Sequence, residues 1–277
     1  MCPITNDKNK SIKINRVEET CAVYFLYTVY MEIIIIFIFG CSIGSFLNVC
    51  IDRLPVGQDV TRGRSHCDHC KRTLSWYELI PVLSWIVQLG KSRCCHKKLS
   101  IQYPLVELVT GIGFLFLYFN YQLSIINYFI SLLLFCSFLV LFVSDLKFEL
   151  LPTGFLIVAF FGVIAQMVLL QTYMNVISGI CAGLFFFLLW FFSKGKAMGD
   201  GDIWLAILIG LVTGYPGIII ALYAAFLTGA IVGVILILGK VKTLKSHIPF
   251  GPFLLLGMVV TLLWQKDLLS LLSNYWL

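Results

Sequence analysis

Charged residues are scarce in this sequence. Lys, Arg, Asp and Glu together make up 12% of the 277 residues, while 60% of the residues are hydrophobic. A soluble domain is about 25% charged and nearer half apolar, so this composition excludes an ordinary soluble protein. Several apolar runs approach the ~20 residues with which a helix crosses a bilayer. The sequence therefore predicts a polytopic membrane protein.

Other patterns are missing as well. No small-residue cleavage site follows the first apolar part, so we do not expect a signal peptide. Residues 1 to about 20 are polar and lack apolar periodicity, which predicts disorder. Met31 opens a compact apolar segment, and we expect it to be the natural start, with residues 1–30 as an upstream extension. N-terminal sequencing of the native protein tests this expectation.

Apolar segments alternate with polar or glycine-rich stretches along the rest of the chain. A long polar loop, from about residue 52 to residue 103, follows the first segment. The turn signal Gly214-Tyr215-Pro216-Gly217 splits one long run into two helices. We therefore expect an all-α, polytopic membrane bundle of about eight transmembrane helices. The expected segments are residues 21–50, 104–119, 123–144, 154–170, 176–192, 203–213, 217–238 and 250–264.

Lysine and arginine are unevenly distributed between the loops. With eight spans, alternate loops share one side, and the loops near 120–122, 171–175 and 214–216 carry no Lys or Arg. The opposite side receives the basic residues of the long loop, with Lys147, Lys194, Lys196, Lys240, Lys242 and Lys245. The positive-inside rule makes these basic loops, including the cysteine-containing loop, cytoplasmic. The net charge of +6 serves topology, so we expect no nucleic acid partner.

Carboxylates lie at the cytoplasmic ends of two predicted helices. Asp145 directly follows an apolar run, and Asp202 lies between two apolar runs. An ionisable residue at membrane depth is a candidate functional residue. If helix packing brings both within a few ångströms, they share one proton. One can then act as general base on water while the other donates to the carbonyl under attack, which predicts peptide hydrolysis. Because Asp202 starts a helix, we expect Asp145 to carry the proton.

Neighbouring acids leave alternatives open. Asp200 is two residues from Asp202 and points in another direction on a helix, so only one of them can face Asp145. The spacing does not choose between them. Glu149 lies deeper in its loop and fits a solvated turn. Gly199 and Gly201 are expected to shape the loop, because glycine permits tight turns and close approach. A hydrated polar turn is the alternative interpretation of this stretch.

Several motifs resemble those of a known family. Gly199-Asp200-Gly201-Asp202 resembles the Gly-x-Gly-Asp signature of membrane aspartic proteases. With Ser144-Asp145 and the downstream Leu151-Pro152, it is similar to the bacterial type IV prepilin leader peptidases. The resemblance selects Asp145 and Asp202 as catalytic. Trp204 departs from the pattern, since relatives often carry Lys there. Other similar stretches, in the family's order, are residues 44–49, 53–55, 78–85, 90–91, 100–107 and 248–253.

The resemblance implies a bifunctional enzyme of the plasma membrane. It would cleave the leader of type IV prepilins or pseudopilins after a glycine, at the cytoplasmic face. It would then methylate the new N-terminal amine with S-adenosylmethionine. Asn48, Arg53 and Gly90 lie in family motifs and are the candidates for methyl transfer, with helix capping and topology as their alternative. Residues 31–118 would form the N-terminal domain and residues 119–277 the peptidase core. A protease without methyl transfer is the alternative.

The ten cysteines fall into groups with different surroundings. Cys41, Cys50, Cys136 and Cys181 lie in apolar runs, where a free cysteine behaves as a small hydrophobe. Family members often carry two Cys-x-x-Cys pairs in the cytoplasmic loop, consistent with a structural zinc site. In this chain that loop contains Cys67, Cys70, Cys94 and Cys95.

The second cysteine pair is altered. Ser92 stands where its first cysteine is expected, Cys95 matches its second cysteine, and the adjacent Cys94 is a candidate substitute for the first. Because adjacent cysteines bind one metal awkwardly, His69 or His96 could complete the set instead. The alternative is a group of reduced thiols without metal.

A transporter and an inert scaffold are the rival classes. Membrane carboxylates can mark ion paths. Transporters, however, place their sites near the bilayer midplane and often show internal repeats, and no convincing repeat is found here. A scaffold would leave the Gly-x-Gly-Asp stretch unexplained. The resemblance implies prepilins or pseudopilins as partners, and the apolar helices imply membrane lipids.

Overall fold

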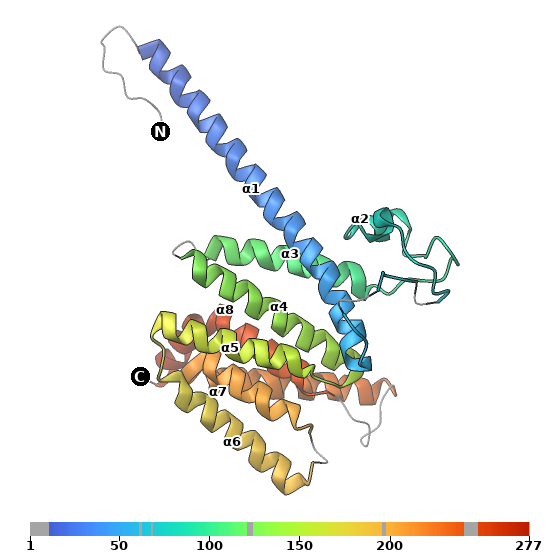
Figure 1. The fold of residues 1–277 in the computed structure, drawn as a ribbon. Helices are drawn as coiled ribbons and strands as arrows, with labels where there is room; N and C mark the ends of the chain where they lie inside the picture. The colour runs from blue at the N-terminus through green and yellow to red at the C-terminus, as the bar shows by residue number, and fades with distance from the viewer. Residues whose placement is uncertain are drawn as a thin grey trace. The chain divides into compact units, whose positions relative to one another are not determined.

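Helices make up most of the protein. The structure, a computed structural model, describes residues 11–60, 63–67, 69–120, 124–195, 198–240 and 249–276. Within these residues the only extended pairings are isolated bridges, His66 with Thr73 and Lys91 with Lys98. The helices, shown in Figure 1, are α1 (Ser11–Arg53), α2 (Leu83–Val87), α3 (Gln102–Asn120), α4 (Ile125–Phe148), α5 (Thr153–Leu170), α6 (Asn175–Ser193), α7 (Gly201–Leu238) and α8 (Gly251–Trp276).

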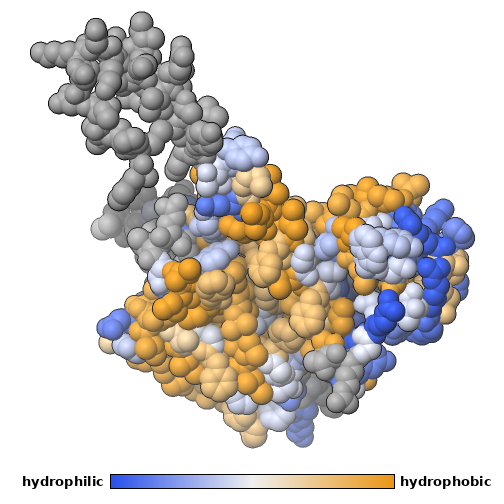
Figure 2. Space-filling model, turned by 45° about the horizontal axis from the view of Figure 1, so that its top comes forward, coloured by the Kyte–Doolittle hydropathy of each residue, from blue (hydrophilic) through white to orange (hydrophobic). Residues whose placement is uncertain are grey.

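Most of these helices suit a lipid environment. Six helices of the described chain are long and apolar enough to cross a membrane, and the shorter stretch Gly251–Trp264 is also apolar. Large apolar side chains cover much of the surface seen in Figure 2. Monomeric soluble proteins rarely expose apolar patches of this extent. The expected all-α polytopic membrane protein is therefore confirmed. The long apolar helices are Tyr27–Val56, Gln102–Asn120, Ile125–Phe148, Thr153–Leu170, Asn175–Ser193 and Gly201–Leu238.

The chain forms two compact units. The first comprises Met1–Ser45 and His66–Asn120, and the second comprises Phe46–Ser65 and Tyr121–Leu277. In the first unit, α1 crosses α3 closely: a β-carbon on Gly40 would lie 2.8 Å from the α-carbon of Gly111. The buried Glu107 of α3 accepts a hydrogen bond from the N–H of Val82 (2.7 Å), which ties the start of α2 to α3.

The second unit is a bundle in which α4 packs on α5 and α8, and α7 packs on α5, α6 and α8. Its core is apolar and centred on Phe186, Leu141, Leu205 and Leu254, each almost completely buried. Burial of such side chains contributes about 1.5–3 kcal/mol each relative to exposure to water. Inside a bilayer, however, close van der Waals packing between the helices replaces the exclusion of water as the main source of this stability.

Helix α7 is broken in the middle and folds back on itself. Gly214 (φ 62°, ψ −174°) and Tyr215 have non-helical backbones, and Pro216 cannot donate a helical hydrogen bond. The side chain of Asn175 donates to the carbonyl of Leu211 (3.0 Å), which satisfies one of the groups that the break leaves open. The predicted turn is therefore confirmed.

Contacts with α8 show that both arms of α7 reach one end of the bundle. In the first arm, Leu205 lies against Gly251 at the start of α8. In the second arm, Gly229 lies against Phe250 and Phe253 of the same region. The segments on either side of the break therefore run in opposite directions.

The predicted disorder of the N-terminal residues is wrong for residues 11–20. Helix α1 begins at Ser11 and continues without interruption into the apolar span. Helix formation is cooperative, so extending an existing helix avoids the cost of nucleation and polar residues can join it. Residues 1–10, which also belong to that expectation, lie outside the described residues.

Candidate active site

Asp145 lies in the last turn of α4. It is buried, with 6% of its surface exposed, and Ser144 before it is fully buried. Glu149 ends the helix in a left-handed conformation (φ 54°), and its N–H donates to the carbonyl of Asp145 (2.9 Å). The side chain of Glu149 is exposed. The helix end therefore holds Asp145 inside the bundle and leaves Glu149 at the surface.

Asp202 is the second residue of α7 and is 7% exposed. The backbone N–H of Gly199 donates a hydrogen bond to its carboxylate. Asp200, in contrast, is exposed, and its Oδ1 accepts the N–H of Gly201 (3.1 Å). Aspartate is a preferred N-cap because its oxygen satisfies a free N–H at the helix start. Asp200 is thus engaged as a cap, whereas Asp202 faces the interior.

Gly251 marks the point where these helix ends meet. A β-carbon on this first residue of α8 would lie 2.5 Å from Oδ2 of Asp145 and 3.3 Å from Cδ2 of Leu205, one turn after Asp202. Asp145 and Asp202 are also close enough for their charges to interact. The structure therefore brings the two predicted catalytic carboxylates to the same end of the second unit. Sequence reasoning missed Gly251, although it noted the surrounding stretch 248–253.

The glycines around Asp202 differ in their surroundings. A β-carbon on Gly201 would lie 2.9 Å from Cδ1 of Leu151, in the loop that follows Asp145. Gly201 therefore permits a close approach between this loop and α7. A β-carbon on Gly199 would meet only the N–H group of Gly201, at 4.0 Å, so close packing does not require glycine at position 199. Gly199 contributes through its backbone N–H instead.

Asp202 lies at the start of a helix, whereas Asp145 lies in the last turn of one helix and beside the start of another. Asp202 is in the first turn of α7, and Asp145 lies against the first residue of α8. Both helix N-termini favour a negative charge nearby. The expectation that Asp145 carries the shared proton stays a prediction. Such a pair titrates as one unit.

An ion pair connects α4 with the end of α1. Nζ of Lys147 lies 2.7 Å from Oδ1 of Asp52, and both residues belong to the second unit. The next residue, Arg53, donates to the carbonyls of Asp59 (3.1 Å) and Arg64 (3.4 Å) in the loop that follows. These contacts fix the end of α1 and its loop beside the helix that carries Asp145.

The candidates for methyl transfer have different surroundings. Asn48 is buried on α1, and the guanidinium of Arg53 is bonded to loop carbonyls. Gly90 belongs to the first unit and adopts a left-handed backbone (φ 66°) under the ring of Trp85, which a β-carbon would approach to 2.9 Å. These contacts support the structural alternative for Arg53 and Gly90. They do not by themselves define a binding site for a methyl donor.

The cysteines of the long loop lie together. Sγ of Cys67 is 3.8 Å from Sγ of Cys95, and Sγ of Cys70 is 2.9 Å from Sγ of Cys94. All four sulfurs are within 4.8 Å of one another. Thiolates around a zinc ion at about 2.3 Å stand about 3.8 Å apart, so the set fits zinc. The histidines considered as substitutes do not belong to this cluster within the described chain; they are His69 and His96.

Hydrogen bonds favour the thiolate of Cys67. Burial raises the pKa of the Cys67 thiol, but hydrogen bonds from Ser92 and from the backbone of Cys70 and His69 lower this pKa by more, to about 6. The hydrogen bond with Cys70 raises the pKa of the Cys94 thiol above its usual value. The thiolate is the form that binds metal. Cys67 thus offers a metal-binding sulfur at neutral pH.

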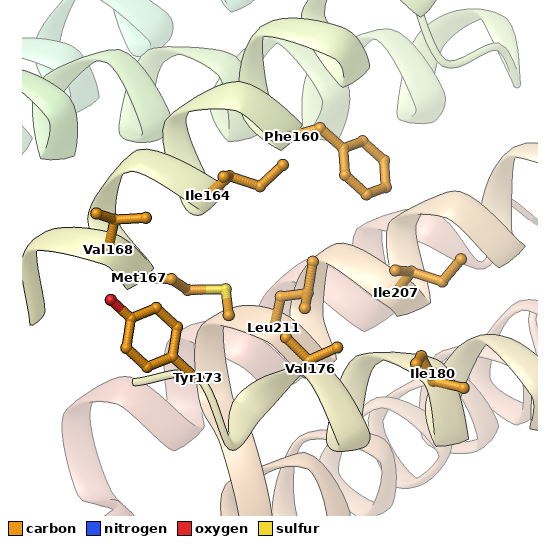
Figure 3. Close-up of a pocket in the computed structure, with 9 residues that line it drawn as sticks. All are labelled: Phe160, Ile164, Met167, Val168, Tyr173, Val176, Ile180, Ile207 and Leu211. Atoms are coloured by element: carbon orange, nitrogen blue, oxygen red, sulfur yellow. The ribbon is translucent and has the colours of Figure 1, made fainter. Parts of the chain in front are cut away.

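A groove of 410 Å³ opens between α5, α6 and α7. Figure 3 shows its lining, with Phe160 and Ile207 at one end and Tyr173 at the other. The ring of Phe160 stands edge-on to Trp204, with centroids 6.1 Å apart. No lining residue carries a charge, so the groove has no group that could activate water. Its lining is apolar and includes neither Asp145 nor Asp202.

Comparisons with known proteins identify related sequences. The profile described as bacterial peptidase A24 N-terminal domain matches residues 38–121, and that of the type IV leader peptidase family matches residues 132–234. The chain is 31% identical over 242 residues to a "Prepilin leader peptidase/N-methyltransferase" of Bacillus subtilis, covering 85% of this chain and 96% of that protein. No solved structure matches.

Other relatives carry the same name. One from Pectobacterium carotovorum is 33% identical over 250 residues, covering 79% of this chain and 88% of the relative. One from Myxococcus xanthus is 32% identical over 219 residues, covering 74% of this chain and 63% of the relative. The fold and the matches define an enzyme embedded in a membrane. The chain belongs to the type IV leader peptidase family.

Proposed function

We propose that the protein is an aspartic endopeptidase in which Asp145 and Asp202 together activate one water molecule. The observation that carries the proposal is their convergence: both are buried at one end of the second unit, and Gly251 leaves room for the Asp145 carboxylate. Asp200 and Glu149 are exposed, which supports Asp202 and Asp145 as the reacting acids.

The pair would act by general acid–base catalysis. The ionised carboxylate takes a proton from water, and the resulting hydroxide attacks the carbonyl carbon of the scissile peptide. The protonated carboxylate donates to the carbonyl oxygen. Like charges in contact cannot both ionise easily, so the pair keeps one proton and both roles are filled at once. Collapse of the tetrahedral intermediate returns a proton to the leaving amine.

The substrates would be type IV prepilins or pseudopilins, cut after the glycine that ends their leader. The curated names of the relatives support this class. The basic residues near this end of the bundle, including Lys147 and Lys194, support a cytoplasmic site in the bacterial plasma membrane. The hydrophobic helix that follows the cut would lie among the membrane helices, with its cytoplasmic end at the carboxylates.

Methylation of the new N-terminus with S-adenosylmethionine would follow cleavage, as the names of the relatives suggest. Asn48, Arg53 and Gly90 remain the candidates for this step, and no catalytic role is assigned to any of them. The division into an N-terminal domain at residues 31–118 and a peptidase core at 119–277 stays part of this proposal.

Four cysteines would hold one zinc ion. Their sulfur spacing fits the metal. Zinc would supply a cross-link between two parts of the loop. The residues that would bind it are Cys67, Cys70, Cys94 and Cys95.

Co-expression with a prepilin tests the peptidase. Wild-type protein should give a shortened product, and Asp145→Asn and Asp202→Asn should each reduce its rate of formation at least about 100-fold, because each removes one acid–base role. Asp200→Asn is the matched control: asparagine caps a helix about as well as aspartate, so cleavage should continue. Normal cleavage by either Asp145→Asn or Asp202→Asn would refute the pair. Mass spectrometry of the product's N-terminus reports cleavage and methylation together.

A further inference from the structure

The cysteine loop contains the same turn twice. In the first copy, the N–H of Cys67 donates to the carbonyl of Arg72 (2.8 Å), and the N–H of Lys71 donates back to the carbonyl of Cys67 (2.9 Å). Lys71 has a left-handed backbone (φ 58°). The bridge between His66 and Thr73 closes this turn.

The second copy repeats each of these contacts 25 residues later, the separation of Cys67 and Ser92. The N–H of Ser92 donates to the carbonyl of Lys97 (2.9 Å), and the N–H of His96 donates to the carbonyl of Ser92 (2.8 Å). His96 is left-handed (φ 56°), as Lys71 is. The bridge between Lys91 and Lys98 closes the turn.

This correspondence identifies equivalent side chains. Cys95 occupies the position of Cys70, and Ser92 occupies the position of Cys67. A hydroxyl therefore stands where the repeated turn would present a sulfur. Cys94, which has no counterpart among the sulfurs of the first turn, brings its Sγ to 2.9 Å from Sγ of Cys70 and 2.9 Å from Oγ of Ser92.

Ser92 nevertheless makes contacts of its own within the cluster. It is buried, with 3% of its surface exposed. Its Oγ lies within hydrogen-bonding distance of Sγ of Cys67 (3.4 Å) as well as that of Cys94. Groups that hydrogen-bond to metal ligands orient them, and their loss typically costs 10–100-fold in metal affinity.

We infer that Cys94 supplies the fourth sulfur in place of a cysteine at position 92, and that Ser92 is a positioning residue that holds the sulfurs of Cys67 and Cys94. The inference rests on the proposed zinc site. It explains how two adjacent cysteines bind one metal ion. Cys95 occupies the regular ligand position of its turn, and Cys94 supplies the sulfur that Ser92 lacks. A cysteine at position 92 should make Cys94 dispensable.

Zinc content and affinity of the full-length protein in detergent test the inference. Cys94→Ser should lower zinc affinity at least about 10-fold, and Ser92→Ala should lower it about 10-fold. The double variant Ser92→Cys/Cys94→Ser should recover the wild-type stoichiometry and an affinity within about threefold of wild type, since it restores the regular pair. Cys181→Ser, on α6 outside the cluster, controls for the loss of a cysteine elsewhere.

The possible outcomes distinguish a failure of the zinc site from a failure of the inference about Cys94 and Ser92. Wild-type protein without bound zinc would reject the zinc site itself, and the inference with it. Wild-type protein with one zinc, combined with a Cys94→Ser variant of unchanged affinity, would overturn the inference alone. A double variant that binds zinc as weakly as Cys94→Ser would also overturn it. The double variant also distinguishes the loss of a zinc ligand from misfolding of the loop. A general folding defect would not be repaired by a second substitution at position 92.

Discussion

At the scale of single residues, the Asp145 carboxylate lies against the bare α-carbon of Gly251. Any side chain at position 251 would have to displace either this carboxylate or the start of α8. A displacement of about 1 Å from the reactive geometry can cost about 100-fold in rate. The space left by Gly251 is therefore a requirement of the proposed reaction and not only of packing.

Gly251→Ala tests this requirement. We expect prepilin cleavage to fall about 10–100-fold while the protein remains folded, because only the end of a side chain and the first residue of a helix must move. Gly154→Ala is the control, since a β-carbon there meets no atom within 4 Å. The measurement is the initial rate of cleavage in detergent, with thermal unfolding in parallel. Equal rates for the two variants would contradict the proposed geometry.

Residue types and spacing predicted part of the site. The acids at positions 145 and 202 stand out because carboxylates are rare beside apolar runs. The choice between Asp200 and Asp202 needed either the family resemblance or the structure, because it depends on which one caps α7. The approach of Gly251 to Asp145 joins positions far apart in the chain, and no local pattern encodes such a contact.

At the scale of secondary-structure elements, the break in α7 decides which loops lie on the same side of the membrane. Gly214 combines φ 62° with ψ −174°, a conformation that is essentially restricted to glycine. A β-carbon there would also collide with the side chain of Asn175. The turn signal was readable in the sequence, but its partner Asn175 was not, because that hydrogen bond crosses between two helices.

Gly214→Ala should destabilise the protein by about 1–3 kcal/mol through backbone strain and this collision. The midpoint of thermal unfolding in detergent should fall by several degrees. Gly233→Ala, also on α7 but with no atom near its β-carbon, should not lower the midpoint, because alanine is favoured over glycine in a helix interior. A Gly214→Ala variant as stable as wild type would show that the turn tolerates a side chain.

The ion pair between Asp52 and Lys147 joins the end of α1 to the end of α4. Both side chains are partly exposed, so the pair is worth no more than about 1 kcal/mol. We expect Asp52→Lys and Lys147→Asp each to reduce cleavage by about two- to fivefold, by loosening the helix end that carries Asp145. The exchanged double variant should regain most of the activity. Failure of the double variant to exceed the single variants would argue against a pairwise role.

At the scale of the whole molecule, the carboxylates and the cysteine cluster belong to different units. Composition and apolar runs predicted the all-α membrane fold well, because lipid leaves helices as the simplest way to satisfy the backbone. The helical state of residues 11–20 was not predictable from local composition, since it depends on the span to which they are joined.

Removal of zinc should affect the units differently. Treatment with a strong chelator should make the loop at residues 66–100 at least several-fold more sensitive to limited proteolysis, since metal binding and folding of such a site are coupled. Leader cleavage should persist, because the proposed reaction needs no metal. Loss of cleavage in step with zinc, restored by zinc alone, would show that the peptidase depends on the loop.

The break in α7 also limits how far the first arm of this helix reaches across the membrane. The first arm of α7, from Asp202 to the turn, is about 20 Å long at 1.5 Å per residue. The hydrocarbon layer is about 30 Å thick, so this arm is about 10 Å too short to cross it. A bilayer adapts to a short span by thinning locally. With Asp202 at the cytoplasmic boundary, we therefore expect the bilayer to be thinner around this arm, so that the exposed Tyr215 reaches the headgroup level that tyrosine favours.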